Sequence, residues 1–135
     1  MDKKELVVST LESLGYVPQA DNDRGIFFPF QMKTIYVILG EEDETYLSVV
    51  LPHFAEIGEG EDAFVLAVCN KVTRNLKLGK VYVDQTCKWV SAACEFFYTD
   101  ERCLRESLEF SLEVLGIVRS VFRKVKDDFL KNTMN

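Results

Sequence analysis

The stretch that decides the fold is NKVTRNLKLGKVYVD, residues 70–84. Its first half carries apolar residues at helical spacing, and its second half alternates apolar and polar residues with the period of a strand. Gly79 separates the two patterns, and we expect it to end the helix. Upstream, the acidic segment 58–62 suits the first turn of that helix. The stretch therefore predicts a largely buried helix that leads directly into a strand over residues 80–84.

The chain that follows residue 84 predicts one more strand and a long helix. Residues 89–98 alternate again, and residues 84–88 form the turn before them. Thr99 is expected to cap a helix that continues to about Lys131. This helix has two apolar stripes, and one sheet face cannot cover both. We expect either a bend near Gly116 or a second partner for the outer stripe, which consists of Phe110, Val114, Ile117 and Val121.

The chain that precedes residue 58 predicts a short helix and three strands. Asp2 is expected to cap the helix with Glu5 in its first turn, and Gly15 to end it in a left-handed conformation. Strands are predicted over residues 26–30, 35–39 and 46–51, where the period is two. Pro29 cannot donate to a ladder and marks an edge strand or a bulge.

The expected architecture is a single α+β domain over residues 1–135. Its order is helix, three strands, helix, two strands, helix. We expect a five-stranded antiparallel sheet with the helices mainly on one face. A length of 135 residues suits one domain, against a prior of roughly 150 residues.

This order resembles the type III secretion chaperone-like fold, and within it the YbjN-type family of candidate bacterial sensory transduction regulators. The family places a similar strand, here Lys80-Val81-Tyr82-Val83-Asp84, directly after its second helix. Where the family has an Asp-x-x-Gly hairpin, this chain has Cys87 in place of the glycine. The resemblance implies a small non-enzymatic protein that binds another protein or acts as a regulator, and it brings no catalytic residues.

The composition argues against several classes of partner and location. Sixteen Lys and Arg against 22 Asp and Glu give a net charge of −6, which disfavours a broad nucleic-acid or anionic-membrane surface. The sequence has neither an apolar run long enough to span a membrane nor a secretory signal pattern. Its four cysteines form no CxxC pair, so we expect free thiols, no metal, no cofactor and a cytoplasmic location.

His53 is the only histidine and hence the only imidazole base. Its sequence neighbours supply no nucleophile, although catalytic groups can assemble in space from distant positions. The alternative function is therefore a small hydrolase-type enzyme in which His53, beside a carboxylate, is the general base.

The aromatic residues of the predicted strands are the main candidate site. If the aliphatic strand faces meet the helices, the opposite face carries Phe27, Tyr36, Tyr46, Tyr82, Trp89 and Phe97. Interfaces are enriched in such side chains. If another part of the chain covers this face instead, these residues have a purely structural role. We expect a protein or peptide partner at this sheet face or at a strand edge. A homodimer through this face or through the final helix is also expected.

Overall fold

The order of helices and strands matches the expected α+β architecture, with one strand added. The computed structural model describes residues 1–21 and 25–134. In this part of the chain the elements are α1 (Lys3–Ser13), β1 (Gln19–Ala20), β2 (Gly25–Phe30), β3 (Lys33–Ile38), β4 (Tyr46–Glu56), α2 (Asp62–Asn75), β5 (Gly79–Val83), β6 (Trp89–Phe97) and α3 (Glu101–Met134). The strands form one antiparallel sheet in the order β1-β2-β3-β4-β6-β5.

The prediction of five strands is wrong because the structure adds the two-residue strand β1. Gln19 pairs with Phe27 and Ala20 with Ile26, along the outer edge of β2. Both β1 residues are exposed, so they carry no apolar alternation that could have indicated a strand.

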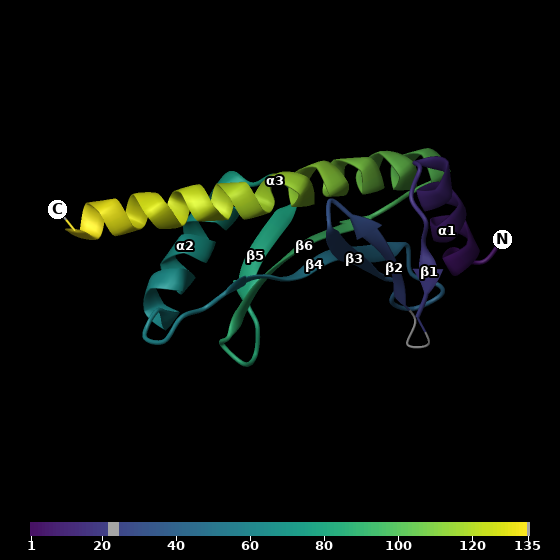
Figure 1. Ribbon diagram of the computed structural model, residues 1–135. Coiled ribbons are helices and arrows are strands. Elements are labelled where there is room, and N and C mark those ends of the chain that lie inside the picture. The colour runs from purple at the N-terminus through teal and green to yellow at the C-terminus, as the bar shows by residue number, and fades with distance from the viewer. Residues whose placement is uncertain (22–24, 135) are drawn as a thin grey trace.

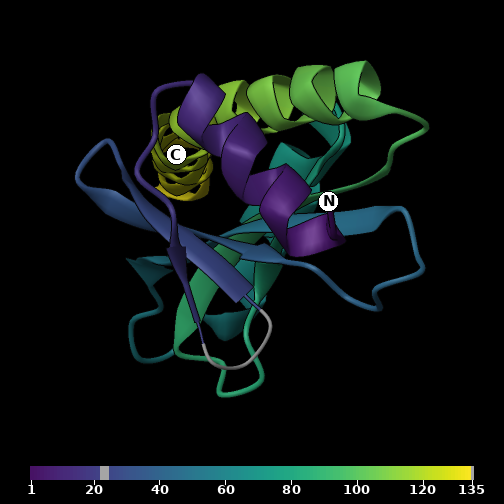
Figure 2. The same cartoon turned by 90° about the vertical axis from the view of Figure 1, so that its right-hand side faces the viewer.

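The core lies between the sheet and the helices, which cover one face (Figures 1 and 2). In the first view α3 runs the length of the molecule, with α1 at one end and α2 at the other. The strands turn aliphatic residues such as Ile26, Val37 and Val49 toward α3, where Leu104 and Leu108 are fully buried. None of the helices in residues 1–21 and 25–134 is long and apolar enough to cross a membrane.

Helix α1 begins and ends as predicted, and its first residue, Lys3, fixes a loop. The Asp2 carboxylate accepts a hydrogen bond from the Glu5 amide, and Gly15 has a φ of 96°. Lys3 is buried, and its ammonium group donates to the carbonyl oxygens of Leu39, Glu41 and Tyr46. Burial lowers the pKa of Lys3 more than the surrounding acidic residues raise it. This side chain therefore holds the β3–β4 loop against the start of α1.

Gly79 has a different role from the predicted one. Helix α2 ends at Asn75, Leu78 takes the left-handed conformation with a φ of 64°, and Gly79 is the first residue of β5. A Cβ on Gly79 would lie 3.0 Å from Cγ1 of Val114 in α3. The glycine thus permits a close approach of β5 to α3, and this contact buries Val114.

Helix α3 begins one residue later than predicted and is continuous through Gly116. The carboxylate of Asp100, not Thr99, caps it by accepting a hydrogen bond from the Cys103 amide at 2.7 Å. No bend is needed, because α2 packs against the C-terminal half of α3 (Figure 1). The Phe64 and Phe129 rings meet edge to face, with centroids 6.0 Å apart.

The outer stripe of α3 is only partly exposed. Val114 is buried and Val121 is half-buried, so the protein itself covers these two members of the stripe. Phe110 and Ile117 remain 38% and 52% exposed. The stripe therefore presents two separate apolar side chains to solvent.

Candidate functional site

The sheet face opposite the helices carries all six aromatic residues expected there. Side chains directly opposite on neighbouring strands point to the same face. The register aligns Phe27 with Tyr36, Tyr46 with Phe97, and Tyr82 with Ser91, and strand parity adds Trp89 to this face. We call this surface, formed by Phe27, Tyr36, Ile38, Tyr46, Tyr82, Trp89 and Phe97, the aromatic face.

The aromatic face is accessible in the described structure. Phe97 is 72% exposed, Ile38 51% and Tyr36 37%. The rings lie in cross-strand pairs: the Phe27 and Tyr36 centroids are 5.8 Å apart, and those of Tyr46 and Phe97 are 5.3 Å apart. Ile38 was missed as a site residue, although its position two residues after Tyr36 places it on the same face.

An ion pair lies among the aromatic rings. Lys80 of β5 pairs with Glu95 of β6, and the Lys80 Nζ atom lies 5.6 Å from the centroid of the Tyr82 ring. The hydrogen bond from Lys80 is the main reason why the pKa of Glu95 lies below its usual value. Burial and a hydrogen bond to Glu95 raise the pKa of Tyr46. Sequence reasoning missed this pair, because charged residues at alternate strand positions are typical of any solvated face.

A hollow of about 430 Å³ opens on the aromatic face between β3 and β4. Tyr36, Ile38, Val50 and Pro52 form most of its apolar lining, and His53 lies at one side. Such a hollow can accept an apolar side chain of a bound segment, because ligand sites are mainly apolar with a few polar groups.

The outer edges of the sheet are largely occupied. On β5, the Thr73 hydroxyl of α2 accepts a hydrogen bond from the Val81 amide at 2.9 Å and donates to the Val81 carbonyl at 3.2 Å. At the opposite side, β1 covers the first part of β2, where the Asp21 amide donates to the Gly25 carbonyl. Pro29 follows Gly25 by four residues, on the same side of the ladder, and has no amide hydrogen to offer. Pro29, from which an edge strand or a bulge was predicted, thus lies on the part of β2 that β1 leaves uncovered, although β2 itself is not the outermost strand.

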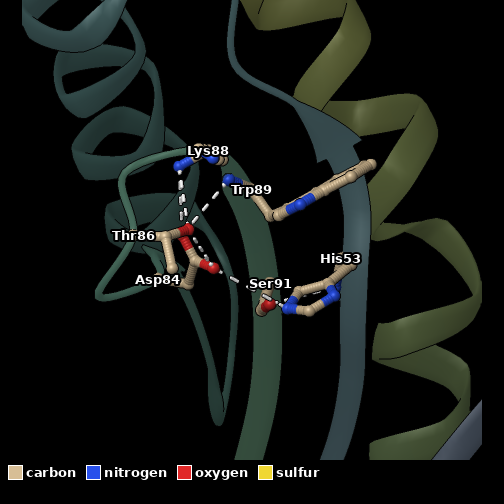
Figure 3. A network of polar contacts seen from close by, with 6 residues as sticks. All are labelled: His53, Asp84, Thr86, Lys88, Trp89 and Ser91. Atoms are coloured by element: carbon tan, nitrogen blue, oxygen red, sulfur yellow. Dashed lines mark hydrogen bonds and ion pairs between the residues drawn. The ribbon is translucent and has the colours of Figure 1, made fainter.

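His53 lies in an irregular part of β4, where the register with β6 shifts between Leu51 and Ala55. Its φ is 52°, and its amide donates to the Ser91 hydroxyl at 3.0 Å. The His53 and Trp89 rings stack with centroids 5.5 Å apart, and His53 Nε2 lies 3.8 Å from Oδ2 of Asp84 (Figure 3). The structure thus brings a carboxylate to the histidine, as the alternative function requires.

The surroundings of this pair favour a structural role for Asp84. Its carboxylate accepts hydrogen bonds from the Thr86 hydroxyl and from the Lys88 and Trp89 amides (Figure 3). Desolvation raises the pKa of Asp84, but these hydrogen bonds and His53 together bring it below its usual value. Ser91 is buried, with its hydroxyl bonded to the His53 amide. The network therefore holds the β5–β6 turn to the irregular segment of β4.

The described residues form no group of three or more histidine, cysteine or acidic side chains that could hold a metal ion. All four cysteines are free, and Cys69 and Cys94 are buried while Cys87 is exposed. Burial raises the pKa of Cys69 and of Cys94 to about 11.

Comparison with known proteins gives structural relatives only. No family model and no curated protein sequence matches the chain. YbjN from E. coli, described as a candidate transcription regulator, superposes with a TM-score of 0.69 at 10% identity, over 86% of this chain and 87% of that chain. The chain adopts the YbjN fold.

Two further structures share this fold. A chain of the HopA1–SchA chaperone–effector complex has a TM-score of 0.59 at 14% identity, covering 89% of this chain and 92% of that chain. An uncharacterised protein from Methanothermobacter thermautotrophicus has a TM-score of 0.54 at 12% identity, covering 90% and 97%. The resemblance to the YbjN and chaperone-like fold is therefore confirmed at the level of architecture.

Proposed function

We propose that this protein is a non-enzymatic protein-binding module, chaperone-like or regulatory, that holds a segment of a partner polypeptide on the aromatic face. The observation that carries the proposal is this uncovered face, which exposes Phe97, Ile38 and Tyr36 and has a mainly apolar hollow lined by Tyr36 and Ile38. Aromatic side chains in such positions contribute most of the binding energy at protein interfaces. The presence of a chaperone–effector complex among the structural relatives supports a protein partner.

The blocked edges favour the face over strand addition as the binding mode. A segment that joined β5 would have to displace the Thr73 hydroxyl from Val81, and one that joined the first part of β2 would have to displace β1. The rest of β2 contains Pro29, which has no amide hydrogen to donate. A segment on the aromatic face displaces only water. The ion pair of Lys80 and Glu95 offers a donor and an acceptor to the backbone of that segment.

We also propose a cytoplasmic location, because four unpaired cysteines suit a reducing compartment. In addition, the apolar character of the aromatic face makes it the preferred surface for a homodimer. The two exposed residues of the outer stripe of α3, Phe110 and Ile117, are too few for an interface of roughly 800 Å² per partner.

Site-specific photocrosslinking tests the binding face. A benzophenone amino acid replaces Phe97 or Ile38 on the aromatic face, and Leu66 on the exposed side of α2 provides the control, since it is 56% exposed. In cells, we expect the probes at positions 97 and 38 to crosslink the same partner, which mass spectrometry identifies. The probe at position 66 should give no adduct with that partner.

Purified components then test the affinity. The double variant Ile38→Ser/Phe97→Ser should bind the crosslinked partner roughly tenfold or more weakly than the wild type, as expected for hot-spot residues. The matched control Leu66→Ser should bind like the wild type. Equal crosslinking at all three positions, or unchanged affinity of the double variant, would contradict the proposal.

A further inference from the structure

A second cavity lies on the helix-covered side of the sheet, away from the aromatic face. It has a volume of about 300 Å³ and is bordered by the β2–β3 turn, the middle of β4 and the middle of α3. The turn comes close to the helix here: a Cβ on Gly116 would lie 3.2 Å from Nε2 of Gln31 and 3.5 Å from Cζ of Phe30. Gly116 therefore permits this close approach of the turn to α3.

Three cations line this cavity. Lys33 extends from β3, and Arg119 and Arg123 lie one turn apart on the same face of α3. In the described ranges, no carboxylate lies within 4.0 Å of any of the three, and their side chains have no hydrogen bond. Like charges at this helical spacing repel each other. Three cations without a carboxylate partner around one cavity create a local positive potential that favours an anion.

The acidic residues of this region line two neighbouring cavities, and Glu109 and Glu113 line the one that shares Phe30 and Gln31 with this cavity. Glu56, Glu61 and Asp127 line an adjoining cavity that shares Arg119 and Arg123, and Glu61 is engaged there by Lys126 at 3.6 Å. The lining of the 300 Å³ cavity itself includes no acidic residue, in a protein whose net charge is −6. The positive charge is thus local and cannot be explained by the general composition.

The rest of the lining is suited to a small organic ligand. Phe30, Leu51 and Leu115 supply an apolar wall, and Gln31 and Ser120 supply neutral hydrogen-bonding groups. Sites for small molecules commonly combine an apolar surface with a few polar groups that fix orientation, in volumes from about 300 Å³ upward. Guanidinium groups match the geometry of phosphate and carboxylate oxygens.

We propose that this cavity binds a small ligand that carries a phosphate or carboxylate group. Arg119, Arg123 and Lys33 hold the anionic group, and the apolar part of the ligand packs on Phe30, Leu51 and Leu115. The site is separate from the aromatic face, so a ligand and a partner protein can be bound at the same time.

Titration of the full chain with two matched probes tests the site and distinguishes the two chemistries. Phenyl phosphate and benzoate share an aromatic ring and differ in the anionic group, and nuclear magnetic resonance shifts or calorimetry report binding. We expect saturable binding of at least one probe, and the tighter of the two identifies the anionic group. The double variant Arg119→Gln/Arg123→Gln should bind that probe roughly tenfold or more weakly, because charge-assisted hydrogen bonds are lost.

The control variant Lys77→Gln/Lys124→Gln removes the same charge from exposed positions outside this cavity and should bind like the wild type. Far-ultraviolet circular dichroism verifies that both double variants fold. The single variant Lys33→Gln, on the opposite side of the cavity, should give an intermediate loss. No saturable binding of either probe by the wild type, or equal losses in the two double variants, would overturn the proposal.

Discussion

Cys87 has the backbone conformation of a glycine. It lies in the β5–β6 turn with a φ of 59°, at the position where the resembling family has glycine. A side chain at such a φ is strained, whereas glycine adopts it freely. We expect Cys87→Gly to raise the free energy of unfolding by about 0.5–1 kcal/mol, measured by urea denaturation. Cys87→Ala keeps the Cβ atom and should give no gain; an equal gain in both variants would assign the effect to the thiol.

The buried ammonium group of Lys3 makes a second residue-scale prediction. Replacement by methionine keeps most of the side-chain volume but leaves the Leu39, Glu41 and Tyr46 carbonyls without this donor. We expect Lys3→Met to lower the free energy of unfolding by about 1–3 kcal/mol, measured by thermal and urea denaturation. Lys4→Met, at an exposed position, should change it by no more than about 0.5 kcal/mol. Similar values for the two variants would show that the three carbonyls do not depend on Lys3.

The thiols should separate into two classes on labelling. At pH 8, a thiol reagent should modify exposed Cys87 quickly and leave Cys69 and Cys94 unmodified, because burial both blocks access and raises their pKa to about 11. Their thiolates form only as the pH approaches 11, so their labelling should stay slow up to that range. Mass spectrometry after a timed quench measures each site. Rapid modification of Cys69 or Cys94 in the native protein would mean that the core is placed wrongly.

At the scale of elements, the end of α3 depends on α2. Phe129 meets the Phe64 ring edge to face, the Lys71 Nζ atom lies 5.5 Å from its centroid, and Lys126 pairs with Glu61 one turn earlier. We expect Phe129→Ala to lower the free energy of unfolding by about 1–2 kcal/mol, less than for a fully buried phenylalanine.

Hydrogen exchange should locate that effect. In the Phe129→Ala variant, amides of the last two turns of α3 should exchange faster than in the wild type, with no change near Leu104. Leu130→Ala, at a position that is 41% exposed, serves as the control and should leave the exchange pattern unchanged. Unchanged exchange in Phe129→Ala would mean that α3 stands without support from α2.

Local patterns were sufficient for most elements of this fold. The cap at Asp2, the left-handed Gly15 and the alternation of the longer strands depend on nearby residues only, and the structure confirms them. Strand β1 and the roles of Gly79 and Gly116 depend on distant chain segments, so no local pattern could indicate them. In the sequence, Gly79 and Gly116 were predicted to end or bend a helix. In the structure, both permit a close approach of another element.

The candidate site was also predictable only where it depends on local patterns. Strand parity placed the six aromatic residues on one face, because the period of two is kept across each strand. The contact of His53 with Asp84, the Lys80–Glu95 pair and the cavity under α3 arise from residues that meet only after folding. The spacing of residues along the chain therefore does not predict these contacts.

At the scale of the whole molecule, we expect self-association through the aromatic face. Light scattering at tens of micromolar should give a mass about twice 15.5 kDa for the wild type and the monomer mass for Ile38→Ser/Phe97→Ser. Phe110→Ser/Ile117→Ser on α3 should remain dimeric, because two isolated apolar residues bury little area. A wild-type monomer at this concentration, or a dimer that only the α3 variant disrupts, would contradict this expectation.

The hydroxyl of Thr73 makes the same pair of backbone hydrogen bonds that an additional strand would make at Val81. An uncovered strand at the border of a sheet can template the stacking of further copies, and such stacking leads to fibres and precipitates. Helix α2 therefore contributes to colloidal stability as well as to the core. A sheet that carries many aromatic rings on one face is at risk of aggregation, and a single oxygen atom at its border reduces that risk.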